Sequence, residues 1–287
     1  MAKSIRIIAV PYHMTQENAG VGRGPQAFLA AGAESILRAT GRKAECEIVQ
    51  QRERFTNEID FLLALHQQIV GQVRHALTHD QFPLILSGNC HASIGALGGL
   101  DSKELGLIWF DAHGDFNTPA TSPSGYFDGM ALAVIAGLCH PQFVKNANDN
   151  LPLPASHIVH LGGRDFDPGE RDNFRDRGVR LIPGDQIEQI GIAAAVQQAR
   201  ETLPLTTSAV HLHLDIDVLN SQDYPANEFP AAGEMPLEDL MLAIELIAKN
   251  FTIQAATLSA YDPAYDLEGK TLRAGLRLIE TIARSMD

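Results

Sequence analysis

Carboxylate and imidazole side chains recur on alternate residues at the ends of two apolar runs. After LGLIWF, the stretch DAHGD brings Asp111, His113 and Asp115, and after AVHLHL come Asp215 and Asp217. Alternate side chains of an extended strand share one face, so each group converges if strand geometry persists as far as Asp115 and Asp217. Side chains of these types are ligands for divalent cations.

A third apolar run, FPLIL, is also followed by a possible metal ligand. This residue is His91, at the place where the chain is expected to turn into a helix. Four carboxylates repel one another unless cations neutralise them, and with two imidazoles they suit two divalent ions about 3.5 to 4 Å apart. The oxygen-rich set favours manganese, with nickel, cobalt or iron as alternatives. A single Asp at the end of a strand is more often a turn or cap residue. Four Asp and two His residues in three such motifs, however, predict a metal site. The predicted ligands are His91, Asp111, His113, Asp115, Asp215 and Asp217.

The elements that position these residues indicate an α/β fold. Short apolar runs alternate with longer amphipathic ones, which is typical of strand and helix units on a parallel sheet. A helix is predicted over 59–77, where apolar residues recur at three- and four-residue steps, and helices are expected on both faces of the sheet. Ligands bind outside the carboxyl ends of strands in such sheets, where all six residues lie. Eight strands are predicted, at 5–10, 45–50, 82–88, 105–111, 157–163, 179–183, 209–218 and 253–261.

Length and composition restrict the class of protein. The 287 residues, 45% of them hydrophobic, predict one domain over 1–287. A formal charge of −13 without a Lys/Arg-rich block argues against nucleic acid as a partner. Three scattered cysteines indicate a reducing compartment. No segment reaches the ~18 apolar residues of a membrane span, so we expect a cytoplasmic protein without a membrane partner.

Gly and Pro cluster in 114–130 and 219–236, which predicts two long active-site loops.

The motifs GNCHAS, DAHGDFNT and HLDIDVLN resemble, in order and spacing, the three metal motifs of the arginase, agmatinase and formimidoylglutamase superfamily. The stretches 20–32 and 162–170 share the likeness, which therefore covers most of the chain. The resemblance implies a three-layer α/β/α sandwich with an eight-stranded, mostly parallel sheet. It also implies a homo-oligomer, because members of the family often form trimers or hexamers.

The same resemblance implies how the metal ions are held and used. In this family, a hydroxide that bridges two manganese ions attacks a guanidinium or amidine carbon, because two cations lower the pKa of bound water. Two carboxylates would bridge the ions, and each ion would have two further ligands. By resemblance the bridging residues are Asp111 and Asp215, with His91 and Asp115 on one ion and His113 and Asp217 on the other.

Near the reacting group, the chain departs from the family's pattern. The proton-shuttle His of arginase-like members is replaced by Asp128 in SGYFDGM, which either exchanges a proton or is a loop carboxylate in solvent. The Glu that clamps a guanidinium is replaced by Ala260, which has no charge to offer. Glu228 in YPANEFP either restores a carboxylate or is a surface charge.

At the other end of the substrate site, the contacts to an amino acid are retained. By resemblance, Asn117, Ser122, Ser124 and Asp167 would hold the α-carboxylate and α-amine; the alternative is that the Asn and Ser residues only shape turns. A retained amino-acid site beside a changed headgroup site predicts a small amino-acid-derived substrate. Candidates are N-hydroxyarginine, arginine and a formimidoyl amino acid.

The second and third motifs also resemble those of the superfamily's N-hydroxyarginine hydrolases, which carry a His at the position of His213. This residue either orients a metal carboxylate or is a buried structural histidine. Cys90, next to His91, either acts near the metals or is an inert buried thiol.

Three functional classes share parts of this pattern. The one it favours is a binuclear metal hydrolase that cleaves a linear, non-peptide carbon–nitrogen bond. The alternative is a noncatalytic family member that binds metal or ligand, motivated by Asp128 and Ala260. A metallophosphoesterase is disfavoured, because SGNCH precedes DAHGD and the GDxxD element is missing.

Overall fold

The computed structural model describes residues 4–100, 104–147 and 151–286. Its centre is an eight-stranded sheet in which all neighbouring strands run parallel, in the order β4-β1-β5-β10-β9-β6-β7-β8. The eight predicted strands are all present. They are β1 (Ser4–Val10), β4 (Ala44–Ile48), β5 (Gln81–Ser87), β6 (Leu105–Phe110), β7 (Ile158–Leu161), β8 (Arg180–Ile182), β9 (Ala209–Asp215) and β10 (Thr252–Ser259).

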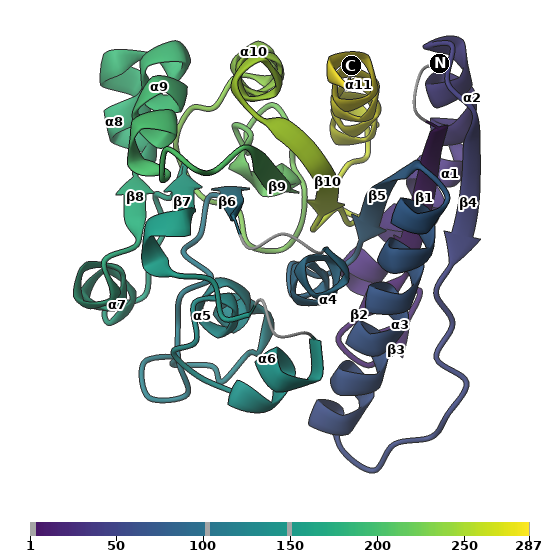
Figure 1. The fold of residues 1–287 in the computed structure, drawn as a ribbon, viewed down its shortest axis with the longest axis horizontal. Coiled ribbons are helices and arrows are strands. Elements are labelled where there is room, and N and C mark those ends of the chain that lie inside the picture. Colours follow the sequence, from purple (N-terminus) through teal and green to yellow (C-terminus); the bar gives the residue numbers. More distant parts are fainter. Residues whose placement is uncertain (1–3, 101–103, 148–150, 287) are drawn as a thin grey trace.

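Helices cover both faces of this sheet, which confirms the predicted three-layer α/β/α arrangement (Figure 1). The helices of each layer enclose one hydrophobic core with the sheet. One layer contains α1 (Gly24–Ala30), α2 (Ala33–Ala39), α8 (Gly184–Ile190), α9 (Ile192–Thr202), α10 (Leu237–Asn250) and α11 (Lys270–Ser285). The other contains α3 (Glu58–Thr78), α4 (Ala92–Gly99), α5 (Ala131–Ile135), α6 (Pro141–Ala147) and α7 (Glu170–Arg177).

The central strands divide their side chains between the two cores. In β6, Ile108 and Phe110 enter the core under α8 to α11, whereas Leu107 and Trp109 enter the core under α3 to α6. All four side chains are fully buried, which is why this strand is a continuous apolar run rather than an alternating one. Helix α3 follows the predicted periodicity and begins after Asn57, whose side chain accepts a hydrogen bond from the Asp60 N–H.

The strands end earlier than the sequence predicted. Strand β6 ends at Phe110, and Asp115 has φ 49°, in the left-handed region, so extended geometry does not persist to that residue. Strand β9 ends at Asp215, and Ile216–Val218 form a turn of 3-10 helix, η4. The prediction that these ligands converge through strand alternation is therefore wrong, although the side chains do meet. A short hairpin of β2 (Tyr12–His13) and β3 (Gln16–Glu17) was not predicted.

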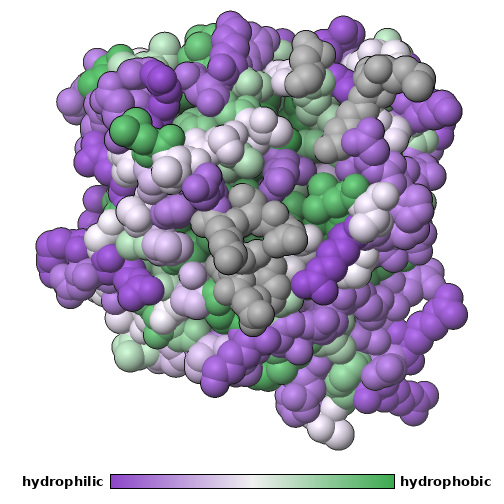
Figure 2. All heavy atoms as spheres, in the orientation of Figure 1, coloured by the Kyte–Doolittle hydropathy of each residue, from purple (hydrophilic) through white to green (hydrophobic). Residues whose placement is uncertain are grey.

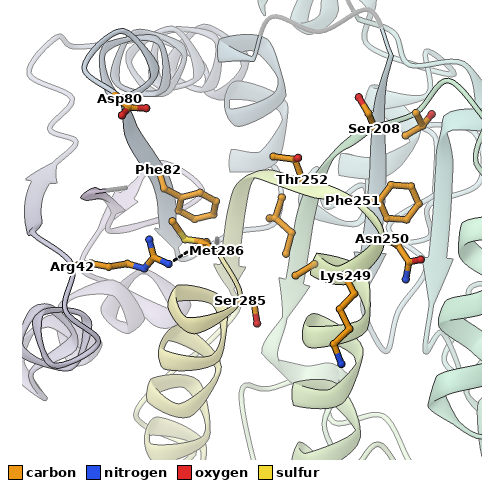
Figure 3. A pocket seen from close by; sticks show the side chains of 13 residues that line it. Arg42, Asp80, Phe82, Ser208, Lys249, Asn250, Phe251, Thr252, Ser285 and Met286 are labelled. Atoms are coloured by element: carbon orange, nitrogen blue, oxygen red, sulfur yellow. Dashed lines mark hydrogen bonds between the residues drawn. The ribbon is translucent and has the colours of Figure 1, made fainter. Parts of the chain in front are cut away.

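Hydrophilic side chains dominate the face seen in Figure 1, and hydrophobic residues form separate patches on it (Figure 2). Among the described residues, no helix is both long and apolar enough to cross a lipid bilayer. A cavity of about 940 Å³ opens at the amino ends of β5, β9 and β10, beside Arg42 and Met286 (Figure 3). The predicted ligands lie at the opposite, carboxyl ends of the strands, so this cavity is separate from them.

Candidate metal and substrate site

The six predicted ligands meet at the carboxyl ends of three strands. His91 follows β5 and precedes α4, the residues of DAHGD follow β6, and Asp215 and Asp217 end β9 and lie in η4. Strands β6 and β9 are direct neighbours, and β10 separates β9 from β5. The parallel sheet therefore brings together motifs that are far apart in the sequence.

Asp111, His113 and Asp217 form the tightest part of the cluster. The His113 Nδ1 atom lies 3.3 Å from Asp217 Oδ2 and 3.6 Å from Asp111 Oδ1. One ligand atom from each of the three residues lies within 4.8 Å of the others, which is a suitable spacing for a shared cation. Asp111 is held in place because its Oδ1 accepts the His113 main-chain N–H and its Oδ2 accepts the Trp109 indole N–H.

Asp215 is fixed in a similar way beside this group. Its Oδ1 accepts the main-chain N–H of Asp217 at 2.8 Å, and its Oδ2 accepts the Cys90 thiol at 2.9 Å. The thiol also contacts Ser259 Oγ at 3.2 Å, and Ser259 in turn contacts His213 Nε2 at 3.4 Å. Cys90 is thus buried, as the inert-thiol interpretation expects, but it also orients a predicted ligand.

His91 and Asp115 complete the cluster with atoms that lack partners. His91 Nδ1 lies 2.9 Å from His66 Nε2, whereas His91 Nε2 is buried without a hydrogen bond. Asp115 Oδ2 and Asp217 Oδ1 are also buried and unpaired among the described residues. Buried polar atoms normally have partners, so three orphan ligand atoms in one cluster fit a set of residues built to hold cations.

Without cations, the buried carboxyl groups are difficult to ionise. Desolvation, with neighbouring carboxylates, raises the pKa of Asp111 and raises the pKa values of Asp115 and Asp215 well above their usual range. His113 and Asp217 form an ion pair instead. Burial opposes both charges, yet Asp217 raises the pKa of His113 well above its usual value, and His113 lowers the pKa of Asp217. A divalent cation would replace the protons that such a site otherwise binds.

A cavity of about 450 Å³ extends from His113 and Asp115 along the 114–130 loop. All four predicted substrate residues line it: Asn117, Ser122, Ser124 and Asp167. The Asn117 amide donates to the Asp167 carboxylate at 2.8 Å, which joins the two sides of the cavity. The Ser122 and Ser124 hydroxyls also accept main-chain N–H groups at 3.0 and 3.2 Å, so both serines shape the loop as well.

A smaller cavity, of about 60 Å³, lies on the other side of His113 and includes Asp128 and Ala260 in its wall. Asp128 is buried, so it is not the solvated loop carboxylate considered above. It accepts the His91 N–H at 2.9 Å and the Asn89 side-chain amide on its other oxygen. Ala260 has φ 66° and leaves this wall without a charged group at its position. Glu228 lies at the rim of this cavity and is exposed.

The family model described as "Arginase family" matches residues 3–284 of the chain. The chain belongs to the arginase family. This confirms the resemblance carried by the three motifs. The family assignment also agrees with the eight-stranded parallel sheet.

Relatives of this arginase-family chain match it over nearly their whole length. It is 30% identical over 291 residues to the arginase of Bacillus subtilis (strain 168) and 29% identical over 293 residues to that of Bacillus caldovelox, with 98% of each chain covered. The crystal structure of arginase from Bacillus cereus superimposes with a TM-score of 0.90 at 29% identity, covering 98% of both chains. The relatives are named arginases, which agrees with the predicted ureohydrolase class.

Two residues beside the candidate site escaped the sequence analysis. His66 contacts His91 from the buried face of α3, where it follows Leu62 by four residues and precedes Ile69 by three. This spacing was a usable signal for burial. Glu170, at the start of α7, reaches back to accept the N–H groups of Phe116 and Asp167 at 2.9 and 3.0 Å. The pattern of residue types gave no signal for that contact.

Replacing Gly114 by Ala is expected to damage the ligand loop of this arginase-family chain. A methyl group at Gly114 would lie 2.6 Å from a Glu170 oxygen and would push the carboxylate away from the Phe116 and Asp167 N–H groups. We expect the free energy of unfolding to fall by about 1–3 kcal/mol. Chemical denaturation measures it. Gly71→Ala is the matched control, because nothing lies within 4 Å of the methyl group that it adds in α3. This variant should be more stable than wild type by up to about 1 kcal/mol. Equal behaviour of the two variants would contradict the role of Gly114.

Proposed function

We propose that this arginase-family chain is a hydrolase that cleaves a linear, non-peptide carbon–nitrogen bond in the guanidino, hydroxyguanidino or formimidoyl group of an amino-acid derivative. The proposal rests on one observation: the cluster of possible metal ligands adjoins a cavity that is lined by the predicted substrate residues. Orphan ligand atoms of His91, Asp115 and Asp217 gather at one end, and Asn117 and Asp167 line the adjoining cavity. The names of the relatives, which are arginases, support a guanidino substrate.

The proposed metal ligands divide into two sets that share Asp111 and Asp215. When bound, two divalent cations, manganese by preference, would lower the pKa of a water and make it a nucleophile near neutral pH. The donor set suits this role, because it is rich in carboxylate oxygen and its imidazoles can coordinate while neutral. By this proposal the ligands are His91, Asp111, Asp115 and Asp215 for one ion, and Asp111, His113, Asp215 and Asp217 for the other.

In this proposal the rest of the cleft binds and orients the substrate. Asp167 attracts the α-amine, and the Asn117 amide and the Ser122 and Ser124 hydroxyls contact the α-carboxylate. Tyr126 lines both cavities and lies between the two ends of the substrate. Fixing the amino-acid end places the reactive carbon next to the ligand cluster, so the reaction gains from orientation rather than from a covalent intermediate.

The proposal is tested by mass spectrometry of the products after manganese-loaded protein has been incubated with single substrates. We expect urea from arginine, hydroxyurea from N-hydroxyarginine, or formamide from formimidoylglutamate. Agmatine and guanidinobutyrate, which each lack part of the amino acid, are tested for comparison. Binding of two ions without any product would reject the hydrolase and favour the noncatalytic alternative.

Asp167→Asn is expected to separate substrate binding from chemistry. Loss of the charge opposite the α-amine should raise KM for an α-amino-acid substrate about 10- to 100-fold with a small effect on kcat, because a hydrogen bond to a charged group contributes about 1.5–3 kcal/mol. Steady-state kinetics on arginine and guanidinobutyrate measure this. Guanidinobutyrate has no α-amine and should be affected little. An equal rise in KM for both substrates would show that Asp167 does not contact the amine.

We further propose that residues 1–287 act as one catalytic domain in a cytoplasmic homo-oligomer. The eight-stranded sheet, to which strands from both ends of the chain contribute, supports the first part. The negative charge and the polar surface support a small-molecule substrate rather than nucleic acid or a membrane as the partner. Size-exclusion chromatography with light scattering tests the oligomeric state.

A further inference from the structure

The hydrogen bonds of Asp128 use both of its carboxylate oxygens to hold neighbouring parts of the chain. Its Oδ1 accepts the main-chain N–H of His91, and its Oδ2 accepts the side-chain amide of Asn89. The Asn89 carbonyl oxygen accepts the Met14 N–H, so the three groups form a buried bridge between the β2 hairpin, the start of α4 and η2 (Asp128–Met130). Both carboxylate oxygens of Asp128 are therefore engaged with donors of the protein itself.

His13 is an imidazole in the wall of the same small cavity. It lies on β2, and its ring centroid is 6.1 Å from that of Tyr126. Its Nδ1 is buried without a partner beside Gly20, where any side chain would collide with the ring at 2.5 Å. Nε2 is therefore the ring nitrogen that remains available for proton transfer. The ring is half-buried, which leaves it in contact with solvent.

We propose that His13 is the proton-transfer residue of the headgroup cavity, in the place that Asp128 does not fill. This assignment rests on the hydrolase function proposed above. In the reaction, the oxygen of water bonds to the reactive carbon, and the carbon–nitrogen bond breaks with its electron pair going to the leaving nitrogen. His13 Nε2 donates a proton to that nitrogen, and the imidazole regains one that originates from the attacking water.

The other ionisable residues of the cavity wall are either already paired or exposed at its rim, or they lie in the ligand cluster. Most of the ionisable groups that share the cavity wall are acidic, and the neighbouring imidazole, that of His113, is paired with Asp217. Asp262 is engaged by Arg23 at 2.7 Å, so it is not free to replace His13. Glu228 is the other candidate, but it is exposed at the rim. The groups on the wall are His113, Tyr126, Asp128, Asp215, Asp217, Glu228 and Asp262.

The test compares His13→Ala and His13→Gln with wild-type protein loaded with manganese. On the substrate that wild-type protein turns over, kcat should fall about 10²- to 10³-fold while KM changes less than about threefold, because proton transfer by a positioned side chain contributes by about that factor. Free imidazole should restore part of kcat in His13→Ala. Bound manganese and the unfolding temperature should match wild type in both variants. His79→Ala, on the exposed end of α3, is the control and should behave as wild type.

Several results would overturn the assignment of His13. One is a kcat within about threefold of wild type in both variants; another is a loss of kcat that imidazole does not restore, which would indicate a structural role. A large loss in Glu228→Gln with none in either His13 variant would assign proton transfer to Glu228. Absence of turnover by wild-type protein on every substrate would instead reject the proposed hydrolase, and the assignment of His13 with it.

Discussion

Replacing Asp111 by Asn should abolish hydrolysis and reduce the bound manganese below two ions, while the protein stays folded. Asp111 is the proposed ligand that both ions share, and its neutral amide cannot bridge two cations. We expect kcat to fall about 10³-fold or more, since metal-assisted catalysis supplies several kcal/mol of transition-state stabilisation. The fold should survive, because Asn has the same shape and its oxygen still accepts the Trp109 or the His113 N–H. Elemental analysis, circular dichroism and product assays measure the three quantities.

Asp185→Asn is the control for this substitution. Asp185 is an exposed carboxylate at the start of α8 whose side chain accepts the N–H of the next residue, Gln186, and its loss should change neither metal content nor kcat. Full activity with two bound ions in Asp111→Asn would remove Asp111 from the ligand set. Loss of metal together with loss of the circular dichroism signal would instead assign Asp111 to the fold.

Adding manganese to metal-free protein should raise the unfolding temperature by an amount that depends on pH. Burial raises the pKa of Glu170 to about 7 and raises those of Asp111, Asp115 and Asp215. The folded metal-free protein thus binds protons that the unfolded chain has released above about pH 4.5. The contribution of these carboxyl groups to stability is therefore most favourable near pH 4.5 and falls as pH rises towards 7, with Glu170 alone accounting for on the order of 2–3 kcal/mol. The buried imidazoles of His66, His91 and His213 act in the opposite direction, because burial lowers their pKa values.

Metal ions compete with those protons, so manganese should stabilise the protein most at pH 8 and least near pH 5. At a free concentration 100 times the Kd, one site adds about 2.7 kcal/mol, which corresponds to a rise of roughly 5–10 °C in the unfolding temperature. Thermal scans with and without manganese at the two pH values measure this. Asp111→Asn should lose most of the shift. An equal shift at both pH values would contradict the competition with protons.

The chemistry of this site could be read from the sequence better than its geometry could. Strand ends rich in Asp and His are visible as residue types after apolar runs, and the parallel sheet then brings three such ends together. The local path of the chain is not visible in the same way. Asp115 adopts a left-handed conformation and Asp217 lies in a turn of 3-10 helix, and neither conformation follows from the apolar run that precedes it.

Side chains that act through distant partners were also beyond prediction. Glu170 holds the ligand loop from 54 residues away along the chain, as its bond to Phe116 shows. The Asp128 carboxylate accepts a hydrogen bond from the Asn89 side chain, and no pattern of residue types near either position predicts this contact. The position of His13 depends on a hairpin so short that its two strands have two residues each. Such contacts are set by tertiary packing, which periodicity and motif spacing do not encode.

The position of β10 has a consequence for how the protein acquires its site during folding. β10 is the last strand of the sheet in chain order, yet it lies in the middle, with β4-β1-β5 on one side and β9-β6-β7-β8 on the other. His91 belongs to the first group of strands, and the other five proposed ligands belong to the second. A nascent chain that has not yet placed β10 holds the two groups apart, so the complete ligand set forms only at the end of folding. Pairings this distant in sequence form slowly, and uptake of the full metal complement would therefore report the closing of the sheet.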